Sequence, residues 1–187
     1  MPIPRLRIDD TVLLVIDVQE RLMPTIVDRD RVCLNCELLI RMSNELRIPT
    51  LVTEQYVKGL GRTVDSVAAA MTDPAARIEK TRFSAAIDMV VDLLHRWRRS
   101  TVLLCGVETH VCVLQTALDL QSLGRQCFVC TDAISSGQRD QIGPALQRMQ
   151  SAGVVLTGVV SAMYELLQDA THPSFRSCLE LAKAVRW

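Results

Sequence analysis

The chain alternates between short apolar runs and helical patterns from one end to the other, and this alternation constrains its fold most. The strand-like runs are residues 11–17, 49–54, 101–107, 126–132 and 153–158, with a shorter and more polar candidate at 77–80. Segments with helical periodicity lie between and after them, at residues 31–46, 85–98, 109–123, 138–151, 161–169 and 174–185. Strands with few polar breaks are buried on both faces, and intervening helices supply the crossovers of a parallel sheet. The sequence therefore predicts a three-layer α/β/α fold with a doubly wound, mainly parallel, Rossmann-like sheet.

Length and composition narrow the class of protein. The 187 residues contain no repeats or linkers, so we expect a single domain over residues 1–187. No apolar run is long enough to span a membrane, and seven cysteines without a secretory signal favour reduced thiols and a cytoplasmic location. The 21 Lys and Arg residues balance 21 Asp and Glu residues, and aromatic residues make up only 4%. This composition gives no basic footprint for nucleic acid or a membrane surface, so we expect neither as a partner. The partner that we expect is a small-molecule substrate.

Polar residues at the carboxyl ends of the predicted strands are the first candidates for chemistry, because doubly wound sheets bind their ligands there. Four residues qualify: Asp17, Glu54, Cys112 and Asp132. Cys112 falls in the first turn of a predicted helix, where unpaired N–H groups and the helix dipole lower the pKa of a thiol. We expect a thiol pKa of roughly 5–7 there, which would make Cys112 a nucleophile.

Two further residues, Asp17 and Lys80, are candidates to act together with Cys112. Asp17 ends a run of five apolar residues and is either a loop carboxylate or the base that takes the thiol proton. Lys80 alone would be a surface lysine, but close to Asp17 and Cys112 its cation would favour the thiolate and hold the base in place.

Three segments of the sequence resemble the isochorismatase-like cysteine hydrolase family. They are Leu-Val-Ile-Asp-Val-Gln at residues 14–19, Lys-Thr-Arg-Phe-Ser at 80–84 and Gly-Val-Glu-Thr-His-Val-Cys-Val at 106–113, the last being the most specific. The resemblance covers about residues 11–170, and Thr-Glu-Gln-Tyr at 53–56 is similar to the small isochorismatase-domain proteins. It implies an Asp17–Lys80–Cys112 catalytic triad. It also implies a cis peptide between Val107 and Glu108, and an oxyanion hole formed by the backbone N–H groups of Glu108 and Cys112.

The resemblance also implies a reaction. Cys112 would attack a carbonyl, an amine or ammonia would leave, and water activated by Asp17 would hydrolyse the thioester. Isochorismatases proper lack the nucleophilic cysteine, so Cys112 favours hydrolysis of an amide or other C–N bond. Nicotinamidase-type members bind a metal through Asp and His residues after the second strand, but this chain has no histidine between Asp17 and Lys80. We therefore expect no metal and no cofactor. Related proteins form dimers or tetramers, so we expect a homo-oligomer.

Residues beside the predicted second strand are candidates for substrate binding. We predict that Glu54 or Gln55 orients a polar group of the substrate, and that Tyr56 or Phe83 forms a wall of its pocket. His110 lies two residues before Cys112 and so projects from another side of the helix, which argues against a Cys–His dyad. The cysteine pairs at residues 33 and 36 and at 127 and 130 are expected to pack in the core rather than to bind metal.

Two alternatives to a cysteine hydrolase remain. The first is a non-catalytic member of the fold that acts as a scaffold or binds a small ligand. The second is a nucleic-acid enzyme, since some members of the family carry a ribonuclease label. The neutral charge and the scarcity of aromatic residues give that second alternative no physical support.

Overall fold

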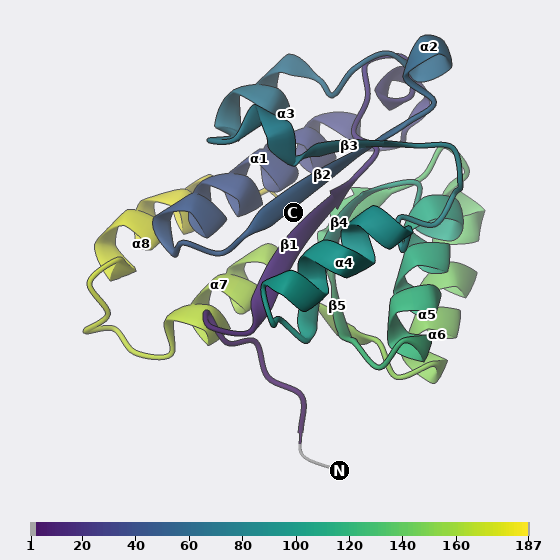
Figure 1. Ribbon diagram of the computed structural model, residues 1–187. Coiled ribbons are helices and arrows are strands. Elements are labelled where there is room, and N and C mark those ends of the chain that lie inside the picture. Colours follow the sequence, from purple (N-terminus) through teal and green to yellow (C-terminus); the bar gives the residue numbers. More distant parts are fainter. Residues whose placement is uncertain (1–2, 187) are drawn as a thin grey trace.

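A computed structural model describes residues 3–186, which form a six-stranded sheet with helices on both faces (Figure 1). The strands are β1 Thr11–Ile16, β2 Thr50–Gln55, β3 Arg77–Lys80, β4 Thr101–Val107, β5 Gln126–Ser135 and β6 Val155–Thr157. Their order is β3-β2-β1-β4-β5-β6, and every neighbouring pair is parallel. The strand order runs outward in both directions from β1 and β4, which confirms the predicted doubly wound α/β/α fold.

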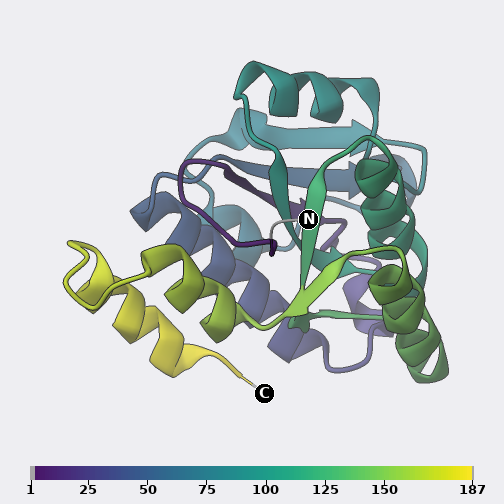
Figure 2. The same cartoon turned by 90° about the horizontal axis from the view of Figure 1, so that it is seen from below.

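The helices other than α2 (Val57–Leu60) form two layers, one on each face of the sheet (Figures 1 and 2). These helices are α1 Arg29–Glu45, α3 Asp65–Ala70, α4 Asp88–Arg96, α5 Leu114–Ser122, α6 Ile142–Ser151, α7 Val159–Leu167 and α8 Phe175–Ala184. Helices α1, α3, α7 and α8 contribute to the core on one face of the sheet, and α4, α5 and α6 to the core on the other. Side chains of β1 alternate between the two cores, and all six of its residues are buried, which explains its continuous apolar run. No helix in the described part of the chain has both the length and the apolar character needed to cross a membrane.

Element boundaries differ from the predicted ranges where tertiary contacts decide them. The helix expected over 109–123 begins as a π-helical turn, Thr109–Val113, and continues as α5. The strand expected over 126–132 runs on to Ser135, because β5 pairs with β4 again after a register shift that sets Ile134 opposite Gly106. Helices α2 and α3 form between β2 and β3, where the sequence predicts no regular element.

Gly106 allows β1 and β4 to approach each other at their carboxyl ends. Its φ is +108°, and a Cβ atom at this position would clash with the backbone oxygen of Ile16. In the sheet Gly106 lies directly opposite Ile16, the last residue of β1. The close approach therefore brings the segment that carries Cys112 towards Asp17, the next residue after Ile16.

We expect Gly106→Ala to destabilise the protein by roughly 3 kcal/mol, since it combines a strained φ with a backbone clash. Gly124→Ala is the matched control, because Gly124 also has a positive φ, +76°, but a Cβ atom added to it would have no other atom within 4 Å. The control should lose only about 1 kcal/mol. Urea unfolding of the three proteins measures both values. Equal losses in the two variants would show that the contact with Ile16 is unimportant.

Candidate active site

Asp17 and Lys80 form a buried ion pair at the carboxyl edge of the sheet. Asp17 follows the last residue of β1, and Lys80 is the last residue of β3. The Lys80 Nζ atom lies 2.6 Å from Asp17 Oδ2, and both side chains are fully buried. The hydroxyl of Thr53 donates a 2.7 Å hydrogen bond to Asp17 Oδ1. One oxygen of the Asp17 carboxylate is therefore held by a residue of β2 and the other by a residue of β3.

The ammonium of Lys80 is surrounded by oxygen acceptors. Besides Asp17, it lies 2.8 Å from Gln55 Oε1, 3.0 Å from the backbone oxygen of Phe83 and 3.2 Å from that of Arg82. An ammonium has three donors and no acceptor, so this set of oxygens matches a cation. These surroundings stabilise Lys80 as a buried positive charge.

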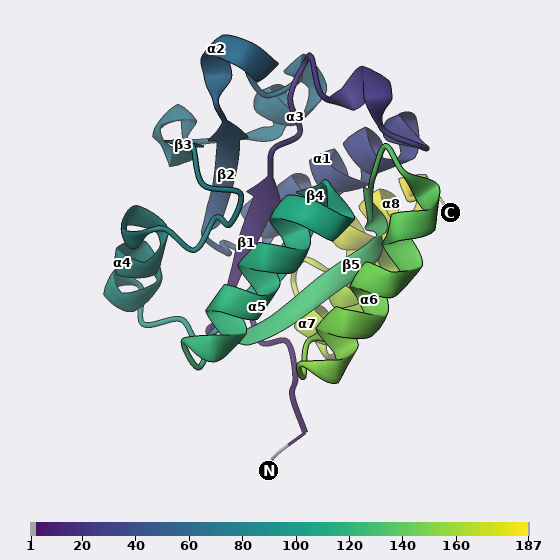
Figure 3. The same cartoon turned by 90° about the vertical axis from the view of Figure 1, so that its right-hand side faces the viewer.

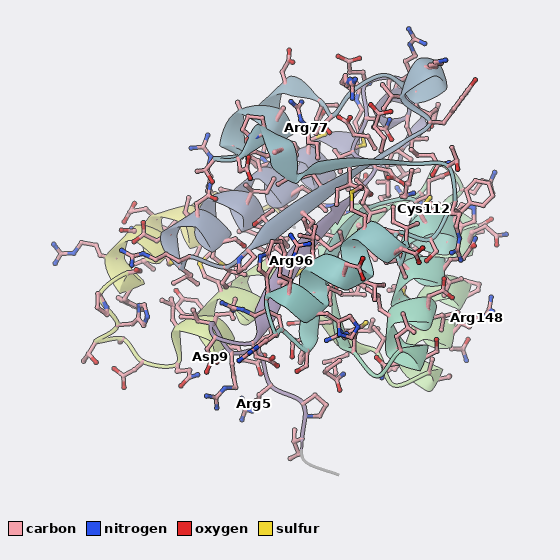
Figure 4. All side chains as sticks on the ribbon, in the orientation of Figure 1. Arg5, Asp9, Arg77, Arg96, Cys112 and Arg148 are labelled. Carbon is pink, nitrogen blue, oxygen red and sulfur yellow. The ribbon has the colours of Figure 1, made fainter. Side chains whose placement is uncertain are left out.

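Cys112 lies in the π turn that joins β4 to α5 (Figure 4). The turn leads into α5, which lies beside α6 on the side of the molecule that faces the viewer in Figure 3. The Val113 N–H bonds the Glu108 carbonyl at 3.1 Å, which closes the wider turn around Cys112. The Thr116 hydroxyl donates to the Cys112 carbonyl at 2.6 Å and accepts from the Ala85 N–H at 2.8 Å. These bonds fix the turn relative to the segment that follows Lys80. The peptide between Val107 and Glu108 is cis, as the resemblance implied.

The environment of Cys112 contradicts the expectation of a lowered thiol pKa. Burial raises the pKa of the Cys112 thiol and the charge of Asp17 raises it further, while Lys80 lowers it only in part, so that the pKa is about 12. The prediction counted the helix terminus and the cation but not the desolvation of a residue that is only 6% exposed. The resting thiol is therefore protonated at neutral pH, and a nucleophile has to be generated by proton transfer.

Glu54 lies away from this cluster, and its predicted role in orienting the substrate stays a prediction. Successive side chains of a strand point to opposite faces, so Glu54 faces away from Thr53 and Gln55. Its carboxylate accepts hydrogen bonds of 2.8 Å from the Thr63 N–H, the Thr63 hydroxyl and Arg62. Burial raises the pKa of this carboxyl, but these hydrogen bonds outweigh burial and leave the pKa below its usual value. Glu54 thus anchors the loop that follows β2.

The other predicted substrate-binding residues lie around Lys80. The amide of Gln55 bonds Lys80 directly, so it belongs to the ion-pair cluster. The side chains of Tyr56 and Phe83 are 56% and 55% exposed. Tyr56 and Lys80 line a groove of about 450 Å³ together with Ile87. The role of the two rings as pocket walls stays a prediction.

Asp132 is the fourth strand-end candidate, and it has a structural role. It lies inside β5 because that strand extends past the predicted end. Its carboxylate accepts the Val159 N–H at 2.9 Å, at the start of α7. Burial raises the pKa of the Asp132 carboxyl, and the bond from Val159 offsets part of the effect.

His110 and the cysteine pairs at residues 33 and 36 and at 127 and 130 lie outside the cluster of Asp17, Lys80 and Cys112. His110 Nδ1 lies 2.9 Å from the Ser136 hydroxyl, in agreement with the argument against a Cys–His dyad. Cys36, Cys127 and Cys130 are buried, and Cys33 is partly exposed. Within residues 3–186, no group of three or more His, Cys, Asp or Glu residues is placed to hold a metal ion.

Three residues that had no predicted role help to build the site. They are Thr53, which holds Asp17, Thr116, which holds the turn of Cys112, and Gln19, which bonds the backbone of Gln55 and Gly61. Thr53 and Gln19 stand within the matched segments 53–56 and 14–19, so the motifs contained the signal. Their bonding partners depend on strand register, which the motifs do not specify.

The chain is similar to known proteins over most of its length. The model of the isochorismatase domain family matches residues 11–160 of the chain. Isochorismatase domain-containing protein 2A of Mus musculus is 35% identical over 175 residues, which cover 94% of this chain and 84% of the mouse protein. The structure of the MAR1 ribonuclease from Caenorhabditis elegans has a TM-score of 0.91 at 34% identity, over 95% of this chain and 92% of that one. The YcaC gene product of Escherichia coli, an octameric hydrolase of unknown specificity, has a TM-score of 0.90 at 25% identity, over 99% and 92% of the chains.

We expect Glu54→Gln to destabilise the protein by about 1–3 kcal/mol at pH 7, because charged hydrogen bonds inside a buried site are lost. Since the folded pKa of Glu54 is lowered, its contribution is present above the ordinary glutamate pKa of about 4.3 and is lost as the pH falls through the folded value. Urea unfolding at pH 7 and at pH 4 should therefore show a smaller difference at the lower pH. Glu79→Gln is the control, since Glu79 shares Arg62 but is exposed, and should cost about 0–1 kcal/mol. Equal stability of wild type and Glu54→Gln at pH 7 would contradict the anchoring role.

Proposed function

This chain belongs to the isochorismatase domain family, and from that premise we propose that it is a hydrolase with Cys112 as its nucleophile. The proposed substrate is a small molecule with an amide or other C–N bond. The observation that carries the proposal is the buried Asp17–Lys80 ion pair, 2.6 Å long, whose charges both act on the Cys112 thiol.

Asp17 is the proposed base. Because the resting thiol is protonated, attack on a carbonyl carbon requires its proton to move to the Asp17 carboxylate as the C–S bond forms. The protonated Asp17 then gives that proton to the leaving amine or ammonia. A water molecule, deprotonated by Asp17, attacks the thioester and releases the acid and the thiol.

The proposed oxyanion hole consists of the backbone N–H groups of Glu108 and Cys112. A hydrogen bond from the Glu108 backbone lowers the pKa of the Cys112 thiol, which supports the choice of this N–H group as a donor. The carboxylate of Glu108 accepts the Gly137 N–H at 2.7 Å, which ties this residue to the loop after β5. One well-placed donor to the oxyanion lowers the barrier of acyl transfer by roughly 2.7–4 kcal/mol.

The proposal extends to the assembly of the protein and to its location. The related E. coli protein is octameric, which supports the proposal that this chain also forms a homo-oligomer. All seven cysteines are free, as suits a reducing compartment such as the cytoplasm. The chain is similar to a ribonuclease from C. elegans, but it has no excess of positive charge with which to bind RNA, since acidic and basic residues are equal in number.

Turnover tests the proposed roles. In a screen of small amides and imides, we expect hydrolysis to disappear in Cys112→Ser and to fall by about 10²–10⁴-fold in Asp17→Asn, which lacks the base. Urea unfolding checks that both variants are folded. Hydrolysis that survives in Cys112→Ser would rule out the cysteine mechanism, and binding without turnover would favour the non-catalytic alternative.

Thiol reactivity tests the electrostatics independently of any substrate. With a pKa of about 12, the thiolate fraction of Cys112 rises tenfold per pH unit, so its rate of alkylation by iodoacetamide should rise similarly from pH 7 to pH 9.5 without a plateau. Asp17→Asn should react faster at each pH, because the charge that raises the thiol pKa is removed while Lys80 remains. Mass mapping follows Cys112, with the partly exposed Cys33 as an internal reference. A plateau below pH 9 in the wild type would contradict the raised pKa.

A further inference from the structure

We propose that Gln55 is a positioning residue that holds the Lys80 ammonium and keeps its charge for Asp17 and Cys112. The inference rests on the proposed function, because it concerns the same cluster. It also assigns Gln55 a role different from the predicted contact with substrate.

The register of two strands brings Gln55 and Lys80 together. Gln55 is directly opposite Lys80 in the β2–β3 pair, and Glu54 is opposite Glu79. Because side chains alternate along a strand, Gln55 and Lys80 share the face on which Thr53 holds Asp17. Glu54 and Glu79 share the other face, where Arg62 bonds both carboxylates at 2.8 and 2.7 Å.

The hydrogen bonds of Gln55 fix the orientation of its amide. The amide nitrogen donates to the Thr81 carbonyl at 2.8 Å, and the amide oxygen accepts from Lys80 Nζ at 2.8 Å. A carbonyl can only accept and an ammonium can only donate, so the opposite orientation would satisfy neither contact. Of the twenty side chains, glutamine offers both groups at this reach, whereas glutamate offers no donor and methionine offers neither.

Gln19 holds the backbone of Gln55 in place. The Gln19 oxygen accepts the Gln55 N–H at 2.7 Å, and the Gln19 nitrogen donates to the Gln55 carbonyl at 2.9 Å and to the Gly61 carbonyl at 2.7 Å. Gln19 is fully buried. Gln55 is therefore rigid at both its backbone and its side chain, as a residue that positions another one needs to be.

A neutral group at position 55 matters because Lys80 has a single carboxylate partner. Among the described residues, Asp17 is the only charged group that pairs with Lys80. The neighbouring charged and titratable groups face elsewhere: Glu54, Arg62 and Glu79 pair with one another, Arg82 lies near Asp119, Glu108 bonds Gly137 and His110 contacts Ser136. A second carboxylate at position 55 would compete with Asp17 for the ammonium and weaken its effect on the thiol.

Two variants separate the charge of residue 55 from its hydrogen bonds. Gln55→Met removes both hydrogen bonds without adding charge, and Gln55→Glu removes the donor and adds a negative charge. The measurement is the rate of iodoacetamide alkylation of Cys112 between pH 7 and pH 9.5, with Cys33 as the internal reference and urea unfolding as the check of folding. Arg21→Met is the matched control, because Arg21 bonds the carbonyls of Lys58 and Gly59 in the same loop but does not touch Gln55.

We expect Gln55→Met to slow the alkylation of Cys112 about twofold, since Lys80 is less firmly held. Gln55→Glu should slow it a further three- to tenfold at each pH, because a higher thiol pKa leaves less thiolate and the greater nucleophilicity of that thiolate offsets only part of the loss. Arg21→Met should react as the wild type does.

Two results would overturn the inference. A folded Gln55→Met that reacts at the wild-type rate would show that Gln55 does not hold Lys80, and equal rates in the Glu and Met variants would show that Lys80 does not respond to charge at position 55. Failure of the proposed function is recognised separately, whatever the variants of Gln55 do: either Cys112→Ser retains turnover, or the wild type binds small amides without hydrolysing them.

Discussion

The buried ion pair between Asp17 and Lys80 is the interaction on which the arrangement of this site depends. Removing two charges from water is unfavourable unless both are well paired and their remaining hydrogen-bonding groups are satisfied. Here Thr53 bonds the second oxygen of Asp17, and Gln55 and two backbone carbonyls surround Lys80. These partners come from β2 and from the segment after β3, while Asp17 follows β1 and Lys80 ends β3. The pair therefore requires β1, β2 and β3 to end at one level.

Strand β2 serves two networks because its side chains alternate between two faces. Thr53 and Gln55 support the ion pair, while Glu54 supports the loop from Tyr56 to Thr63. The loop is in turn bonded to β2 through Gln19, which joins the backbone of Gln55 to Gly61. The position of the loop and the position of Lys80 are therefore coupled through a single strand end.

The architecture could be predicted from the sequence because burial on both faces produces continuous apolar strands, of which residues 11–16 are the clearest case. Asp17, Lys80 and Cys112 could be selected because each stands in a recognisable segment next to a strand end. The role of Glu54 could not be predicted, since it depends on which face of β2 points to the site. The state of the Cys112 thiol depends on burial and on the distance to Asp17, and neither quantity is encoded in the local pattern around the cysteine.

The neutral resting thiol gives the cluster a simple electrostatic property. In the proposed mechanism, the site contains an anionic Asp17, a cationic Lys80 and a neutral thiol before proton transfer. Afterwards it contains a neutral Asp17, the same cation and a thiolate. The net charge of the buried site is zero in both states, so the transfer moves a negative charge around Lys80 without adding one to the interior. A thiol with a permanently lowered pKa would instead place a second anion beside Asp17, around one ammonium. Burial raises the pKa of Cys112 and the charge of Asp17 raises it further, and this raised pKa fits the proposed mechanism, in which the thiol gives up its proton only during attack on the electrophile.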